Sequence, residues 1–259
     1  MGPAMSRGFS WVFLPAGYPS SVSRDYLSYQ IWDTAQGFLG YLKGILLSLS
    51  FLRGMGVGQE SSSLSRAMQI SLVRDSVGVI SGLVVGIPPV TNAFSEKASL
   101  RTYRVVSEVL RLVAGLLEIY ASVYSREYFL HLSCLIVVLN TVATVMATQT
   151  RASLVTHFAC TDNVSDCAAK EGNQERGIKV FGIPLAVLLL QWLGEDIQNV
   201  MNWYAVLVIL QLICNILAVR ALDLDGAGGG RQRDGDASPR APENVVVVPS
   251  DSIPKNKSL

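Results

Sequence analysis

The sequence is poor in charged residues. Asp, Glu, Lys and Arg make up 16% of its 259 residues, against ~25% in soluble globular domains. Half of the residues are hydrophobic and the mean hydropathy is +0.36. So few charges cannot cover the surface of a soluble domain, and we therefore expect membrane lipid to contact part of the chain. The net charge of +1 gives no positive excess, so we expect no nucleic-acid partner.

The sequence also lacks the motifs of common enzymes and metal sites. Its four cysteines match no zinc-binding spacing, so we expect free thiols and no bound metal. No P-loop, H-E-x-x-H, G-x-S-x-G or kinase motif occurs. These absences favour a protein that is not an enzyme and that holds no cofactor.

Long runs without charge organise the chain. Residues 76–95, 128–150 and 197–219 contain no Asp, Glu, Lys or Arg. Each reaches the ~20 residues that a helix needs to cross ~30 Å of hydrocarbon. A fourth apolar segment, residues 180–194, is shorter. It would span only together with its flanks, or it would form a half-helix bent at Pro184.

Two further segments have the spacing of amphipathic helices. In residues 33–53 apolar side chains recur every three or four positions, and residues 103–124 carry several charges. There Glu108 is at pairing distance from both Arg104 and Arg111. The second segment is therefore either an interfacial helix or a packed helix with buried ion pairs. No segment of useful length alternates with a period of two, so we expect no strands.

These patterns predict an all-α polytopic helical membrane protein. We expect five or six helices, of which three to five span the bilayer. Residues 1–12 form an N-terminal extension and residues 13–222 the helical membrane domain. Residues 223–259 are rich in Gly, Pro, Ser and charge, which is typical of a disordered C-terminal tail.

The first of two polar, aromatic-rich blocks covers residues 13–33. Its prolines and Gly17 predict a rigid turn. Ser21 or Ser23 is then placed to cap a helix that begins near Arg24.

One face of this expected helix is polar. Tyr29, Gln30 and Asp33 follow at one-turn spacing. The tyrosines and Trp32 suit an anchor helix at the membrane–water interface. The alternative is a ligand-facing patch made by Tyr29, Gln30 and Asp33.

The second block covers residues 150–175. Arg151 ends an apolar run, as a snorkelling cation would. Asn163 and Asp166 resemble a capping box, and Asp166 and Lys170 are an i,i+4 pair. All of these features are compatible with ordinary helix electrostatics. The alternative is a site lined by His157, Asp166 and Lys170.

Arg74 and Asp75 stand at the start of the first charge-free run. They are either an interfacial charge pair or part of a substrate or ion pathway, because ionisable residues beside a membrane helix often mark one.

Several of these segments, in this order, resemble the root UVB sensitive (RUS) family. The resemblance covers residues 13–194 and is carried by LPAGYPSSVSRDYLSYQIWD, LRGMGVGQE, LVRD, TRASLVTHFA and AAKEGNQE. It implies a membrane-associated protein linked, in plants, to early-seedling UV-B responses and vitamin B6 homeostasis. The chain departs from the family pattern after Asp75 and over residues 106–117, where mostly apolar residues replace expected acids.

Our leading hypothesis is a carrier, or a carrier subunit, in small-molecule homeostasis that is related to vitamin B6. The alternative is a membrane scaffold that binds a protein partner or a family paralogue through the two polar blocks. We expect an integral membrane protein, with no indication of the organelle. We also expect the two blocks to meet on one side of the membrane and share a polar site. The candidate binding residues are Tyr29, Gln30, Asp33, Arg74, Asp75, Arg151, His157, Asp166 and Lys170.

Overall fold

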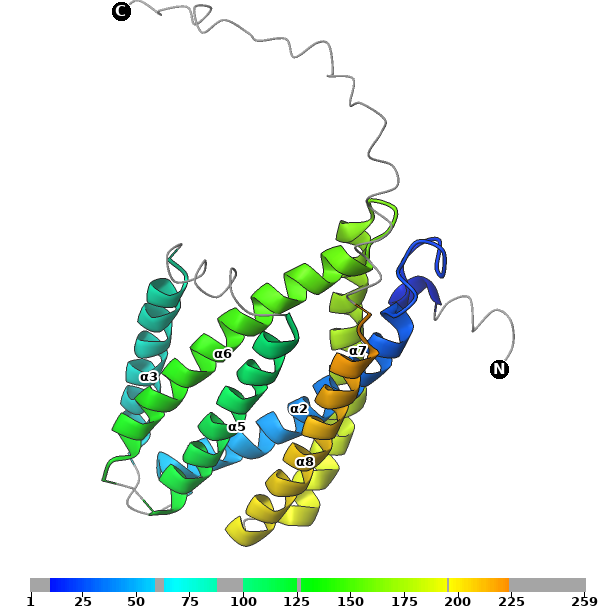
Figure 1. Cartoon of the computed structure of the whole chain (residues 1–259). Coiled ribbons are helices and arrows are strands. Elements are labelled where there is room, and N and C mark those ends of the chain that lie inside the picture. The colour runs from blue at the N-terminus through cyan, green and yellow to red at the C-terminus, as the bar shows by residue number, and fades with distance from the viewer. Residues whose placement is uncertain (1–9, 59–62, 88–99, 125–126, 195, 224–259) are drawn as a thin grey trace, which may run out of the picture. The chain divides into compact units, whose positions relative to one another are not determined.

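The computed structural model describes residues 10–58, 63–87, 100–124, 127–194 and 196–223. Its long helices are α2 (Tyr26–Gly54), α3 (Leu64–Val85), α5 (Leu100–Tyr124), α6 (Phe129–Phe158), α7 (Val164–Leu193) and α8 (Ile197–Ala221) (Figure 1). The expected tail lies outside the described residues except for Asp223, and so does the expected extension except for residues 10–12.

The all-α prediction is confirmed. Within the described ranges, β pairing is limited to one isolated bridge between Val22 and Ala159. Among the described residues, five helices are long and apolar enough to cross a membrane, namely α2, α3, α6, α7 and α8. Large apolar side chains such as Leu83, Phe181 and Ile209 point outward and are more than half exposed. A soluble protein rarely presents so much apolar surface.

The first helix differs from the prediction at its start. α2 is one continuous helix of 29 residues that includes the segment expected at 33–53. Its N-cap position is Asp25, and no side chain caps it, so the predicted serine cap is wrong. The Ser23 hydroxyl instead donates to one oxygen of the Asp25 carboxylate. The other oxygen of this carboxylate is hydrogen-bonded to His157 Nε2. Local spacing could not show this distant partner.

Helix α3 begins earlier than expected. It starts at Leu64, before the charge-free run, so Arg74 and Asp75 lie inside the helix and not at its start. Arg74 bonds Glu118 of α5 at 2.9 Å and lies over the Phe51 ring. The helix tolerates this cation because a carboxylate and an aromatic face neutralise it.

Helix α7 includes the short apolar segment together with its N-terminal flank. It runs for 30 residues with Pro184 inside, so the segment forms one continuous helix with this flank and not a separate half-helix, and the whole helix is long and apolar enough to cross a membrane. The predicted capping box is wrong, because the Asn163 side chain caps nothing. Asp166 accepts a hydrogen bond from the Ala16 backbone N–H instead, at 2.7 Å.

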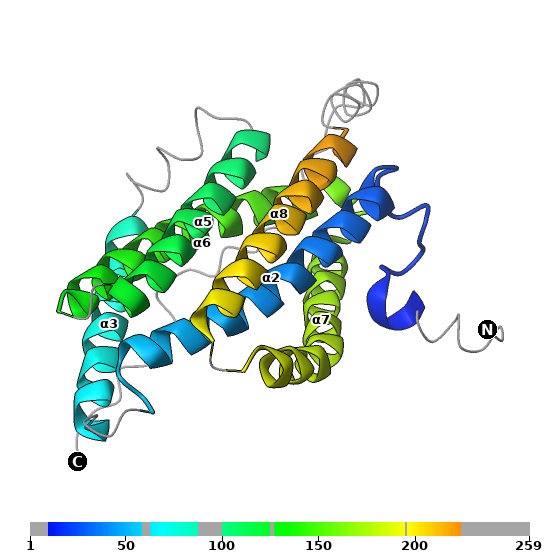
Figure 2. The same cartoon turned by 90° about the horizontal axis from the view of Figure 1, so that it is seen from below.

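Close helix packing around α2 positions the site. α2 packs against α8, α7 and α5, α5 packs on α6, and α3 packs on α6. In Figure 2, α8 lies alongside α2. A Cβ at Gly115 would lie 2.0 Å from the Tyr204 hydroxyl, so only glycine permits this approach of α5 to α8. The apolar core contains Leu42, Leu46, Ile119, Ala186, Leu193, Val200, Tyr204 and Leu207.

Candidate functional site

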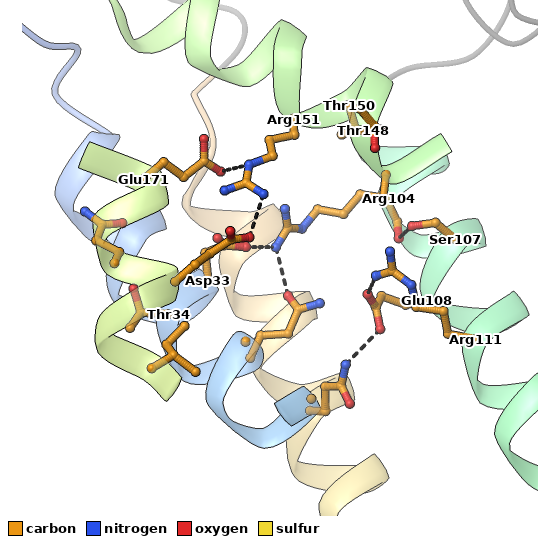
Figure 3. Close-up of a pocket in the computed structure, with 18 of the residues that line it drawn as sticks. Asp33, Thr34, Arg104, Ser107, Glu108, Arg111, Thr148, Thr150, Arg151 and Glu171 are labelled. Carbon is orange, nitrogen blue, oxygen red and sulfur yellow. Dashed lines mark hydrogen bonds and ion pairs between the residues drawn. The ribbon is translucent and has the colours of Figure 1, made fainter. Parts of the chain in front are cut away.

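A polar cavity of about 490 Å³ lies among five helices (Figure 3). One face of each helix lines it, because the lining residues recur every three or four positions. α2 contributes Tyr29, Asp33, Gln36, Gly40 and Lys43. The other walls include Arg104, Glu108 and Arg111 of α5, Thr144, Thr148 and Arg151 of α6, Glu171, Gln174 and Glu175 of α7, and Gln211 of α8.

Arg104 connects α5 to α2 across the cavity. Its guanidinium bonds the Tyr29 hydroxyl and the Asp33 carboxylate, and it donates to Gln36 Oε1 at 2.8 Å. The Tyr29 and Gln36 side chains are buried. One planar guanidinium can bond three acceptors at once because it presents five donors in a fixed geometry.

Arg151 holds the second charged group, which we call the Arg151 end. Its Nε bonds Glu171 and its Nη1 bonds Glu175, each at 2.6 Å. Both carboxylates belong to α7, so this cation joins α6 to α7. Two carboxylates share a single arginine here.

The third group, which we call the Lys43 end, contains Lys43, Glu108, Arg111 and Gln211. Glu108 Oε1 accepts from Arg111 at 2.8 Å, and Oε2 accepts from Gln211 Nε2 at 2.9 Å. Lys43 lies in electrostatic reach of Glu108 and Arg111. In Figure 3, Glu108 and Arg111 lie on one side of the cavity, Arg151 and Glu171 lie on another, and Arg104 reaches between them.

The cavity is suited to a small polar solute with charge. Its volume lies within the range of roughly 300–1,000 Å³ that is typical of small-molecule sites. Both signs of charge line it, and buried charges among apolar helices are costly unless they are paired or functional. In the described part of the chain, no group of three or more His, Cys, Asp or Glu side chains could hold a metal ion. The lining therefore favours hydrogen bonding and ion pairing to an organic ligand.

A second set of polar contacts, outside the cavity, joins the two polar blocks of the sequence. We call this region the junction. Ser23 N–H donates to Phe158 O at 3.1 Å, and Cys160 N–H donates to Ser21 O at 3.2 Å. His157 Nε2 lies 3.0 Å from Asp25 Oδ2, with both side chains nearly buried. The two blocks thus meet, as the sequence predicts.

The α7 part of the junction bonds the N-terminal segment mainly through backbone atoms. Lys170 donates to Trp11 O, and Asn173 donates to Val12 O at 2.9 Å. Gln174 donates to Phe13 O at 2.9 Å and also lines the cavity. The N-terminal segment is therefore fixed to the outer face of the cavity wall.

The nine candidate residues fall into separate places. Tyr29, Asp33 and Arg151 line the cavity. His157, Asp166 and Lys170 belong to the junction, where Asp25, Ala16 and Trp11 bond them. Gln30 is buried outside the cavity lining, and its Oε1 has no partner among the described residues; Arg74 bonds Glu118, and Asp75 is exposed.

Most of the cavity was not recognisable in the sequence as a site. Arg104, Glu108 and Arg111 stood out as charges in a largely apolar helix, and Arg111 pairs with Glu108, although only the Glu108 side chain is buried. Arg104 does not pair with Glu108. It pairs with Asp33, which lies 71 positions away in the sequence. Lys43 is the one charge between Asp33 and Arg53, and this isolation in an apolar run was a usable signal.

Comparisons with known proteins agree with the resemblance. The family model described as "Vitamin B6 photo-protection and homoeostasis domain" matches residues 3–231. The chain is 32% identical to RUS family member 1 of Dictyostelium discoideum over 82% of this chain and 40% of that protein. It is 30% identical to protein root UVB sensitive 3 of Arabidopsis thaliana over 82% of this chain and 48% of that protein.

This chain thus spans less than half the length of these curated relatives. No solved structure matches it. The match of the family model over nearly the whole chain, together with these identities, shows that the chain belongs to the root UVB sensitive family.

Proposed function

We propose that this protein is an integral membrane carrier, or a subunit of one, for a small polar metabolite. The observation that carries the proposal is the charged cavity, whose walls include α2, α6, α7 and α8. These four helices are long and apolar enough to cross a membrane. Ionisable residues between such helices commonly mark a substrate or ion pathway.

The substrate class that we propose is a vitamin B6 vitamer or a related metabolite. The support is the description of the family model, which names vitamin B6 photo-protection and homoeostasis. B6 vitamers are substituted pyridines with hydroxyl groups, and some carry a phosphate. Their polar groups suit a cavity lined by guanidinium, carboxylate, amide and hydroxyl groups.

The scaffold alternative has less support. It requires the polar groups of the two sequence blocks to be available to a partner protein. The chain itself already bonds His157, Asp166 and Lys170. The cavity, in contrast, is an open volume lined by charge.

Transport into liposomes tests the carrier proposal. The full chain is reconstituted in lipid vesicles, and uptake of radiolabelled pyridoxine and pyridoxine 5′-phosphate is measured. The variant Asp33→Asn weakens the pairing with Arg104 in the cavity, and its matched control is Asp166→Asn, which makes the same change at the junction. We expect Asp33→Asn to lower uptake and Asp166→Asn to leave it near the wild-type rate.

Three results would contradict parts of the proposal. Release of the protein from membranes by alkaline carbonate would show that it is not integral. Uptake no faster than in protein-free vesicles, by a chain that is folded and inserted, would remove B6 vitamers as substrates. Equal uptake by Asp33→Asn and wild type would show that transport does not depend on the Asp33 pairing in this cavity.

A further inference from the structure

The Lys43 end carries more positive than negative charge. Lys43 and Arg111 face one carboxylate, Glu108. Both oxygens of Glu108 already accept hydrogen bonds, from Arg111 and Gln211. Lys43 therefore has no carboxylate of its own.

Lys43 is buried and makes no hydrogen bond or ion pair with the described part of the chain. Its residue is 7% exposed, in a helix apolar enough to cross a membrane. An ammonium in such a place costs free energy unless an anion or a set of acceptors compensates it. Lys43 lines the cavity, so a ligand in this open volume could accept hydrogen bonds from its ammonium.

Gln211 supplies a second unmatched group at the same end. Its Nε2 bonds Glu108, but its Oε1 is buried without a partner. Gly40 lies one turn before Lys43, and a Cβ there would approach Gln211 Nε2 to 3.4 Å. Gly40 therefore lines the cavity directly beside the Gln211 amide. Lys43, with an unpaired ammonium, and Gln211, with an unpaired amide oxygen, both line this one volume.

We propose that the Lys43 end binds the anionic group, a phosphate or a carboxylate, of the solute that the cavity carries. This inference rests on the proposed function and specifies its substrate class. Lys43 supplies the compensating cation, and a second cation, Arg111, adds N–H donors that Glu108 does not occupy. Gln211 Oε1 accepts from a hydroxyl or a protonated oxygen next to the anion.

Thermal melting of the detergent-solubilised full chain gives a first test without any assumption about the solute. Inorganic phosphate is the probe, titrated against chloride at equal ionic strength. The variants are Lys43→Met, Lys43→Arg and the matched control Lys179→Met, which removes an exposed lysine of α7 outside the cavity. We expect phosphate to raise the Tm of wild type and Lys179→Met more than that of Lys43→Met.

The same experiment contains an internal check. Without phosphate, Lys43→Met should melt at or above the wild-type Tm, because an uncompensated buried cation has been replaced by an apolar chain of similar length. Lys43→Arg should retain most of the response to phosphate. The general effect of phosphate on apolar burial acts on all variants alike and cancels in the difference. An equal phosphate shift in wild type and Lys43→Met would overturn the proposal.

A second measurement identifies the anion. Binding of pyridoxine, pyridoxine 5′-phosphate and 4-pyridoxate is compared in wild type and Lys43→Met. We expect the anionic vitamer that fits to bind roughly tenfold or more tightly than pyridoxine, and this preference to disappear in Lys43→Met. Preference for the phosphate ester assigns a phosphate site, and preference for 4-pyridoxate assigns a carboxylate site.

The outcomes separate this inference from the carrier proposal. If inorganic phosphate acts through Lys43 while no vitamer binds, the anion site stands and vitamin B6 is the wrong substrate class. If vitamers are transported but their ranking is the same in Lys43→Met, the carrier stands and the assignment of Lys43 is wrong.

Discussion

The junction and the cavity are built from the same kinds of side chain, but they use them differently. At the junction, Asp166 and Lys170 bond backbone groups, and His157 bonds the Asp25 carboxylate. In the cavity, charges bond one another around an open volume, and Lys43 and the Oε1 atom of Gln211 have no hydrogen-bond partner within the described part of the chain.

This difference distinguishes polar groups that stabilise the fold from polar groups that are available to bind a ligand. A polar group whose capacity is used within the chain stabilises the fold, because losing its partner leaves a desolvated donor or acceptor. A polar group that faces open volume remains available to a ligand. Within the two polar blocks, the junction residues therefore fix the N-terminal segment, whereas Tyr29, Asp33 and Arg151 of the same blocks join charges of other helices in the candidate binding site.

Removal of the central cation of the cavity should have the largest effect. Arg104→Met takes away three bonds, to Tyr29, Asp33 and Gln36, and leaves the half-buried Asp33 carboxylate without its partner. We expect a loss in the free energy of unfolding toward the lower end of the about 3–5 kcal/mol that breaking a buried ion pair costs, because the Asp33 side chain keeps some contact with solvent. Melting in detergent measures it. Arg104→Lys should recover only part of this lost stability, because an ammonium cannot reproduce the planar, multiple hydrogen bonding of a guanidinium. A normal Tm for Arg104→Met would show that the group is hydrated and not structural.

A plug in the cavity should abolish transport at little cost in stability. Gly40→Leu places a side chain in the open volume beside Lys43, and its Cβ requires only a shift of the Gln211 amide. Replacing a helix-interior glycine gains about 0.5–1 kcal/mol of helix propensity, which offsets the steric cost. Uptake and Tm are measured on the same preparation. As a control, Gly44→Leu changes a glycine of α2 with open space around it, outside the cavity lining. Full uptake by Gly40→Leu would rule out this cavity as the route.

The junction should respond in the opposite way. His157→Ala removes the bond to Asp25, where both side chains are nearly buried. We expect a loss of roughly 1–3 kcal/mol in stability and unchanged selectivity among B6 vitamers. His157→Gln keeps a donor and should lose less. A changed ranking of vitamers in His157→Ala, with Tm unaltered, would place the junction in the binding site and break the distinction between the two regions.

Local patterns in the sequence predicted most of the helices. The charge-free runs at 128–150 and 197–219 correspond to α6 and α8, because apolar length is what a spanning helix requires. The start of α3 was missed since Arg74 interrupts the apolar pattern, and its partner Glu118 is 44 residues away. A search for charge-free segments misses a membrane helix whose charged residue is paired with a residue of another helix.

The cavity could be predicted only in part for the same reason. Spacing within one helix favours the pair Arg104–Glu108, whereas packing brings Arg104 to Asp33 and Glu108 to Arg111 and Gln211. Tyr29, Asp33 and Arg151 were identified because they lie in the two distinctive blocks. Lys43 and Gln211 lie in ordinary apolar helices, and only the packing of α2 against α8 and α5 gives them a role.

The smallest effect should come from Lys170, although the sequence made it a candidate for the binding site. Lys170 donates to the Trp11 carbonyl at an exposed position, so water can replace this hydrogen bond. We expect Lys170→Ala to change the free energy of unfolding by less than about 1 kcal/mol and to leave uptake unchanged. The measurement is the same pair of assays, melting and uptake, beside Lys43→Met. A loss of uptake in Lys170→Ala at normal Tm would mean that the N-terminal segment takes part in transport, because Lys170 fixes that segment and does not line the cavity between the helices.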